Sequence, residues 1–250
     1  MACGVGCSTE DIENKEYQDL SGWRGVTLRE LLSRLVGKVT EEVRIYTVAT
    51  TKFNKDSKII GHYGSGPNLE GGLATLCTCK HSMRRYHNCD EWKGKWILGL
   101  TSRDKNKGFC GEHYLLYMMK VEQAFESHLA FYKHLAQTNP AALRIKNAVT
   151  NRLGDIFMPQ AVCTNPLDPR MYEFPHKNHS HGHDVNEDWE DDISYMRSSP
   201  AERLPTPLLL GDIENTFVWP KPMIKFELKQ NTGNRKLTLG EDFFASLKDA

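Results

Sequence analysis

The stretch from Gly61 to Arg85 contains the residues that are best suited to chemistry. Cys79 is followed by Lys80 and then by Arg84, so a thiol lies beside two cations. Nearby positive charge favours the thiolate form of a cysteine, which is the nucleophilic form. A cysteine in a strand is, however, more often a small core residue. The sequence therefore offers Cys79 as a candidate nucleophile, with core packing as the alternative.

Five glycines precede this thiol, between residues 61 and 72. Glycine adopts positive φ angles and lets a backbone approach a ligand closely, and such loops offer N–H groups to phosphates. The chain has neither a P-loop nor a dinucleotide-binding glycine motif. We therefore keep two interpretations, a flexible surface loop and a loop that binds a nucleotide-like anion. In the second, Lys80 and Arg84 hold the phosphate.

Polar and aromatic side chains near this loop complete the predicted nucleotide site. Gly66 allows a close approach, and Asn68 is placed to hydrogen-bond a base edge. Tyr63 and Trp96 offer rings on which a base can stack. The basic cluster also has a plainer interpretation, because a solvated basic helix end has the same composition.

A histidine-rich run is a second candidate site. His179, His181 and His183 alternate within "HKNHSHGHD", and Asp188 follows. Imidazoles with carboxylates suit Zn²⁺, Fe²⁺ or Mn²⁺, so a divalent metal is the one cofactor that the sequence suggests. Asp188 is then a metal ligand or a catalytic acid/base group, together with Cys79 and Lys80. A hydrophilic tract without a ligand explains the same composition.

Composition limits the class of protein. The 250 residues contain 32 Lys+Arg and 32 Asp+Glu, so no overall charge marks a nucleic-acid or membrane binder. No apolar run approaches the roughly 18 residues that a membrane-spanning helix needs. The acidic N-terminus does not resemble a signal peptide, and residues 1–23 are expected to form a flexible leader. Seven cysteines, an odd number, indicate reduced thiols in a cytoplasmic protein.

The elements that must position these residues are predicted by periodicity. Helical spacing is found at 28–36, after the capping box of Thr27 and Glu30, and again at 127–138. Strands are expected at 43–50, 94–102 and 112–125, with a hairpin joining the last two. Shorter strands are expected at "LATLCTC", "GDIFMP" and "PLLLGD", a proline-interrupted one at "FVWPKPMIKFEL", and a closing helix at "LGEDFFASLKDA". We predict an α+β fold with one domain over 24–250, built around a small mixed or antiparallel sheet or barrel, with flanking helices and an irregular C-terminal region.

The order of several motifs resembles a known family. Gly66-Pro67-Asn68, Gly72, Thr75-Leu76 and Thr78-Cys79-Lys80 with Arg84 are similar to G-x-A-P-N…G-x-C-T-L-A-x-C-K-P-x-I-R. "GKWILG", "YLLYMMKV", "HDVNEDWEDDISY" and "LLLGDIENTFVW" are similar to later motifs. Over about 43–226 the chain thus resembles the nucleotide-modification-associated domains of the second and third type, which occur in bacteria and phages near predicted DNA base-modification genes.

The chain departs from this pattern at several positions. Ala74 stands where the family has its first Cys, Cys77 where it often has Ala, His81 for Pro, Met83 for Ile and Lys95 for Asp. The loss of the first Cys argues against a mechanism that needs two thiols, unless Cys77 replaces it.

The resemblance implies a protein that modifies DNA bases or nucleotides, with nucleotide or DNA and other DNA-modification proteins as partners and no membrane. Cys79 would attack a pyrimidine ring as an activated thiolate. The first alternative is a non-catalytic reader of modified bases, for which a barrel resembling the PUA-like domains would be suitable. The second is a protein-interaction module. An enzyme predicts that Cys79 and the histidine-rich region meet in one site, and a reader predicts an aromatic cage without a nucleophile.

Overall fold

A computed structural model describes residues 20, 22–23, 25–62, 66–147, 156–173, 192–193, 195–196, 203–228 and 235–249. The fold is α+β, as the sequence predicted. Its centre is a six-stranded sheet in the order β11-β1-β5-β6-β9-β4. These strands are β1 (Glu42–Val48), β4 (Thr75–Leu76), β5 (Trp96–Thr101), β6 (Leu115–Phe125), β9 (Leu208–Val218) and β11 (Arg235–Thr238).

The sheet is mixed and open. Strands β1 and β5 are parallel, whereas β5/β6, β6/β9, β1/β11 and β4/β9 are antiparallel. The edge strands β11 and β4 do not pair with each other among the described residues. The described strands therefore form the mixed sheet that was one of the expected alternatives, and they do not form a barrel.

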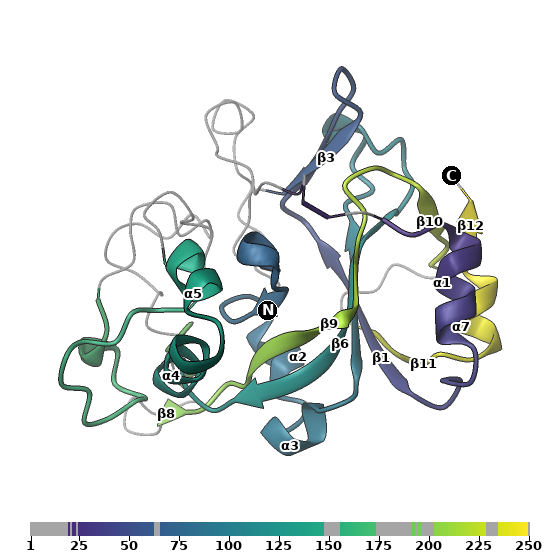
Figure 1. The fold of residues 1–250 in the computed structure, drawn as a ribbon. Helices are drawn as coiled ribbons and strands as arrows, with labels where there is room; N and C mark the ends of the chain where they lie inside the picture. The colour runs from purple at the N-terminus through teal and green to yellow at the C-terminus, as the bar shows by residue number, and fades with distance from the viewer. Residues whose placement is uncertain are drawn as a thin grey trace.

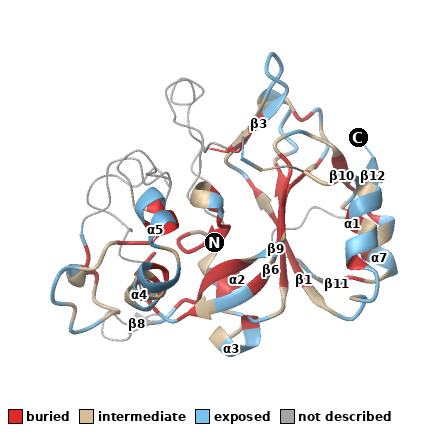
Figure 2. Ribbon diagram, in the orientation of Figure 1, coloured by how far each residue is buried: buried red, intermediate tan, exposed pale blue. Residues whose placement is uncertain are grey.

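Helices lie on both sides of this sheet (Figure 1). Helix α1 (Leu28–Leu35) and helix α7 (Glu241–Ala245) pack on one face, where Leu31, Leu35 and Phe243 join Trp96 in a hydrophobic cluster. Helices α4 (His128–Thr138) and α5 (Pro140–Lys146) pack where β6 ends and β9 begins. Figure 2 shows that burial is concentrated in the sheet, while α1, α4 and α7 expose their outer sides.

The segment that carries the predicted site is folded against the other face of the sheet. It contains two four-residue helices, α2 (His81–Arg84) and α3 (Cys89–Trp92). Met83 and Trp92 are fully buried there, in a cluster with Tyr46, Ile97 and Tyr117. Since strand side chains alternate between faces, β1 directs Val43 and Ile45 to one cluster and Tyr46 and Val48 to the other.

The remaining short elements complete the described part of the chain. They are β2 (Thr51–Asn54), β3 (Ile59–His62), β7 (Tyr195–Met196), β8 (Arg203–Leu204), β10 (Ile224–Phe226) and β12 (Leu247–Asp249), with the 3₁₀ turns η2 (Glu70–Gly72), η3 (Lys105–Lys107) and η4 (Pro169–Met171). No helix among the described residues has both the length and the apolar character that crossing a membrane requires.

Local signals predicted most of these elements, and the differences have physical reasons. The capping box of Thr27 and Glu30 is confirmed, as are strands β1, β5 and β6. The short strand expected at "PLLLGD" is an eleven-residue strand, β9, because its register shifts accommodate the Gly211-Asp212 step. At "GDIFMP" the strand prediction is wrong for the described residues 156–159, where an isolated bridge between Pro159 and Tyr172 forms instead.

Candidate functional site

Cys79 lies just beyond the end of a strand. Strand β4 ends at Leu76, and bends follow at 77–79, so the strand alternation that would place Cys77 and Cys79 on one face does not apply. Cys77 is buried in the cluster that contains Phe131. Cys79 is half-buried against the cluster that contains Tyr46, and it is not part of a disulfide. The two cysteines therefore lie in different clusters, and Cys79 is the one that adjoins Tyr46.

Gly66 and two tyrosines lie around Cys79. A Cβ on Gly66 would be 2.8 Å from the Cys79 Cβ, so only glycine permits this approach. The Tyr46 and Tyr117 hydroxyls share a hydrogen bond of 2.7 Å. Burial raises the pKa of both phenols, and negative charge on Cys79 would raise them further. A negative charge on Cys79 would therefore interact with these two neutral hydroxyls.

Lys80 has a backbone conformation that is unusual for its residue type. Its φ of 62° and ψ of 40° place it in the left-handed region, which costs free energy for a non-glycine residue and is frequent at functional sites. Its Nζ lies 5.2 Å from the centre of the Tyr46 ring, a cation–π distance. The turn therefore directs the ammonium toward the same tyrosine that adjoins Cys79.

Arg84 is fully buried, so the alternative interpretation of the basic cluster as a solvated helix end does not apply to this residue. Its Nε donates to the Cys79 carbonyl at 2.8 Å, and Nη1 donates to the carbonyls of Pro207 at 2.6 Å and Thr206 at 3.4 Å. Burial lowers the pKa of Arg84, while the charges of Cys77, Asp192, Cys79 and Tyr46 oppose that change. An arginine stays charged in such an environment.

The guanidinium of Arg84 is incompletely satisfied. Within the described part of the chain it forms no ion pair with a carboxylate, and its Nη2 has no hydrogen-bond partner. The buried Oγ1 of Thr206, the residue whose carbonyl Arg84 contacts, lacks a partner as well. Buried polar groups are almost always paired, so these two atoms are the candidate contacts for a polar ligand.

Asn68 is buried in the loop that also contains Gly66. Its backbone pairs with that of Thr75, and its Oδ1 accepts hydrogen bonds from the Glu70 N–H and from Lys146 Nζ, both at 3.0 Å. Its Nδ2 has no partner among the described residues. The amide therefore keeps a donor for a ligand, at a buried position rather than on an exposed base-reading surface.

His81 and Asp192 form a pair that sequence reasoning missed. His81 Nε2 lies 2.8 Å from Asp192 Oδ1, and the Asp192 side chain is fully buried. His128 fixes the same segment through its Nε2, which donates to the Asp192 carbonyl at 3.0 Å. Asp192 belongs to the same acidic run as Asp188, the carboxylate that the sequence favoured and that lies outside the described residues.

Other predicted site residues lie elsewhere. Trp96 is fully buried on the opposite face of the sheet, where its indole stacks with Phe217, so it is a core residue and offers no exposed ring to a base. Tyr63, Asp188, His179, His181 and His183 lie outside the described residues. No group of three potential metal ligands occurs among the residues that are described.

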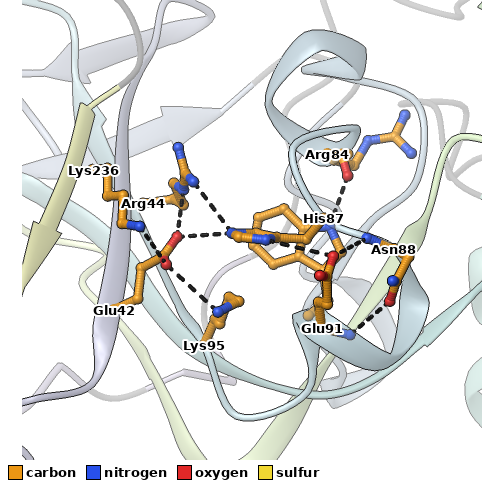
Figure 3. Close-up of polar contacts among 9 residues, drawn as sticks. Glu42, Arg44, Arg84, His87, Asn88, Glu91, Lys95 and Lys236 are labelled. Carbon is orange, nitrogen blue, oxygen red and sulfur yellow. Dashed lines mark hydrogen bonds and ion pairs between the residues drawn. The ribbon is translucent and has the colours of Figure 1, made fainter.

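A second polar cluster lies near the start of β1 (Figure 3). Glu42 accepts hydrogen bonds from Arg44 at 2.7 Å and from His87 at 2.9 Å, and its other oxygen is 3.1 Å from Lys236 and 3.5 Å from Lys95. Burial raises the pKa of Glu42, but the hydrogen bonds from His87, Lys236 and Arg44 outweigh it and lower the pKa to about 2. One carboxylate thus balances three cations and ties the α2–α3 segment to the sheet.

The structure therefore brings Gly66, Asn68, Cys79, Lys80 and Arg84 into one region, and it separates Trp96 from them. The arrangement offers buried hydrogen-bond donors and a thiol, which suit an anionic ligand with a polar edge. Comparison of the chain with protein-family models, curated proteins and solved structures finds no match.

Proposed function

We propose that the protein binds a nucleotide-like ligand at the Cys79 region and acts in the modification of nucleotides or DNA bases. The observation that carries this proposal is the buried Arg84 Nη2, a charged donor without a partner among the described residues. Charge-assisted hydrogen bonds to phosphate oxygens are the strongest that arginine forms. A phosphate oxygen on Nη2 would supply the missing partner and the missing counter-charge together.

The neighbouring groups give this ligand a reaction partner. Cys79 is a thiol between the Gly66 loop and Lys80, and a thiolate adds to electrophilic ring carbons of pyrimidines. The His81–Asp192 pair is suited to proton transfer, since a buried carboxylate orients the imidazole. In this proposal Arg84 and Lys80 bind the anion, and Cys79 is the nucleophile.

Calorimetric titration with dUMP, single-stranded DNA and duplex DNA tests the proposal. We expect the native protein to bind and Cys79→Ser to bind with unchanged affinity. Arg84→Lys keeps the charge but loses the Nη2 donor, so its affinity should fall at least about tenfold. The affinity of Lys80→Ala should fall less, because a partly exposed ammonium is screened by water. Absence of binding by the native protein, or equal binding by Arg84→Lys, overturns the proposal.

The nucleophilic role has its own test. After incubation with each ligand, mass spectrometry of the denatured protein should show an adduct on Cys79 that Cys79→Ser lacks. Binding without any adduct would favour the reader of modified bases over the enzyme.

A further inference from the structure

We propose that Asn68 selects ligands whose base presents a carbonyl oxygen, and rejects those that present an amino group at the same position. This inference rests on the proposed function and names the substrate class of that site as keto bases. It is carried by the hydrogen bonds that fix the side-chain amide of Asn68.

The orientation of the Asn68 amide follows from the chemistry of its neighbours. Oδ1 lies 3.0 Å from the Glu70 backbone nitrogen and 3.0 Å from Lys146 Nζ. A peptide N–H can only donate, and a lysine ammonium has three donors and no acceptor. If the amide were rotated, its NH₂ group would face two donors. The oxygen must therefore lie on this side, and the assignment comes from the network rather than from the shape of the amide.

Lys146 makes the arrangement rigid. It is the last residue of α5 and only 3% exposed. Besides the Asn68 Oδ1, its Nζ lies 3.0 Å from the Leu73 carbonyl, 3.0 Å from Thr75 Oγ1 and 3.4 Å from the Asn68 carbonyl. An ammonium with four oxygen neighbours is held in place, and it holds the loop before β4 against α5 in turn.

The opposite end of the same amide has a donor to give. Nδ2 of Asn68 is buried and has no hydrogen-bond partner within the described ranges. Two residues earlier, Gly66 is in close approach to the Cys79 Cβ, so the loop that adjoins the thiol also carries this donor. Leaving a buried amide NH₂ unpaired is costly, and a ligand acceptor removes that cost.

A lone donor of fixed polarity discriminates between bases. Thymine, uracil and guanine present a carbonyl oxygen at the position where cytosine and adenine present an amino group. An amino group facing Nδ2 would place two donors against each other, and both would stay unpaired. Sites that leave buried polar groups unpaired reject the wrong ligand by at least about tenfold.

The pair dUMP and dCMP tests this selectivity, because the two nucleotides differ only in the keto or amino group and the adjacent ring nitrogen. In calorimetric titrations we expect the native protein to bind dUMP at least about tenfold more tightly than dCMP. Asn68→Asp should reverse the preference, since one carboxylate oxygen stays on Lys146 and the Glu70 N–H while the other becomes an acceptor. The matched control is Thr75→Val, which removes the contacts of Thr75 Oγ1 with Lys146 Nζ and with the Asn68 carbonyl but keeps the side-chain amide of Asn68. It should keep the native preference.

Each result has a distinct meaning. Equal binding of the two nucleotides by the native protein, tighter binding of dCMP, or an unchanged preference in Asn68→Asp overturns the role of Asn68 and leaves the proposed function standing. If neither nucleotide binds, nor dU₁₂ and dC₁₂ oligonucleotides, the proposed function fails and this inference with it. Thermal unfolding of each variant verifies that the fold is retained, and Asn68→Ser, which keeps a small polar group, replaces Asn68→Asp if that variant unfolds. It should lose the preference.

Discussion

Tyr46 and Tyr117 share a hydrogen bond across an intervening strand. Their hydroxyl oxygens are 2.7 Å apart and their rings meet edge to face at 6.2 Å, yet Tyr46 belongs to β1 and Tyr117 to β6. Between them, in register with both, is Gly99 of β5. A Cβ on Gly99 would collide with the Tyr117 ring. A glycine in a central strand thus makes room for the tyrosine pair that adjoins Cys79.

The hydrogen bond between these tyrosines predicts a pattern of stabilities. Tyr117→Phe leaves the buried Tyr46 hydroxyl without its partner, so we expect a loss of about 1–3 kcal/mol in the free energy of unfolding. Replacing both tyrosines by Phe removes both polar groups, and the double variant should lose less than the sum of the single changes. Urea denaturation of the three variants measures this. Strictly additive losses would show that the hydroxyls do not interact.

The close approach at Gly99 predicts a steric penalty. Gly99→Ala introduces a methyl group into a fully packed core and should destabilise the protein by about 1–3 kcal/mol. In a Tyr117→Ala background the ring is absent, so the same change should cost much less. The comparison of the two backgrounds by denaturation is the measurement, and an equal cost in both would place the strain elsewhere.

The Glu42 network predicts a pH-dependent stability (Figure 3). Hydrogen bonds lower the pKa of Glu42 from 4.5 to about 2, so the unfolded state takes up the proton first as pH falls. The stabilisation is complete above about pH 4.5 and is lost on acidification toward pH 2. Glu42→Gln should therefore melt below the native protein at pH 7, and the difference should shrink across this window.

The exposed Glu122 on β6 supplies a control for that experiment. Glu122→Gln should follow the melting temperature of the native protein at every pH. A Glu42→Gln difference that stays constant from pH 7 to pH 2 would show that the lost ion pairs do not depend on the charge of Glu42.

The buried His62 predicts a second dependence of stability on pH, which begins at a higher pH than that of Glu42. Burial lowers its pKa from 6.5 to about 3, and its Nε2 contacts Thr50 Oγ1 at 3.1 Å. The unfolded chain binds a proton at His62 below about pH 6.5 while the folded protein does not, so folding loses stability as pH falls from 6.5 toward 3. His62→Gln should reduce the drop in melting temperature between pH 7 and pH 5. Parallel melting curves for both proteins would refute this.

Local signals in the sequence predicted much of the fold. The capping box of Thr27 and Glu30 and the alternation in β6 act over a few residues, so they can be recognised without the tertiary structure. The order of the strands cannot be recognised from such local signals, because Tyr46, Gly99 and Tyr117 are aligned only once β1, β5 and β6 pair. Strand β9 was also underestimated, since Gly211-Asp212 has the composition of a turn and here lies within a strand.

The candidate site was predictable in its sequence-local part. Cys79, Lys80 and Arg84 are neighbours in the chain, and they are also neighbours in space. Basic residues are usually exposed, so the burial of Arg84 and of Lys146 gave no sequence signal. Their partners, such as Pro207 and Asn68, come from distant segments.

The most direct test of the central claim, that Arg84 binds the anionic group of the ligand, compares dUMP with deoxyuridine, which lacks the phosphate. Thermal unfolding of the native protein and of Arg84→Lys is measured with each compound at equal concentration and ionic strength. We expect dUMP to raise the melting temperature of the native protein more than deoxyuridine does, and we expect this difference to disappear in Arg84→Lys. Equal stabilisation of the native protein by both compounds, or a difference that survives in Arg84→Lys, would show that Arg84 does not bind the phosphate.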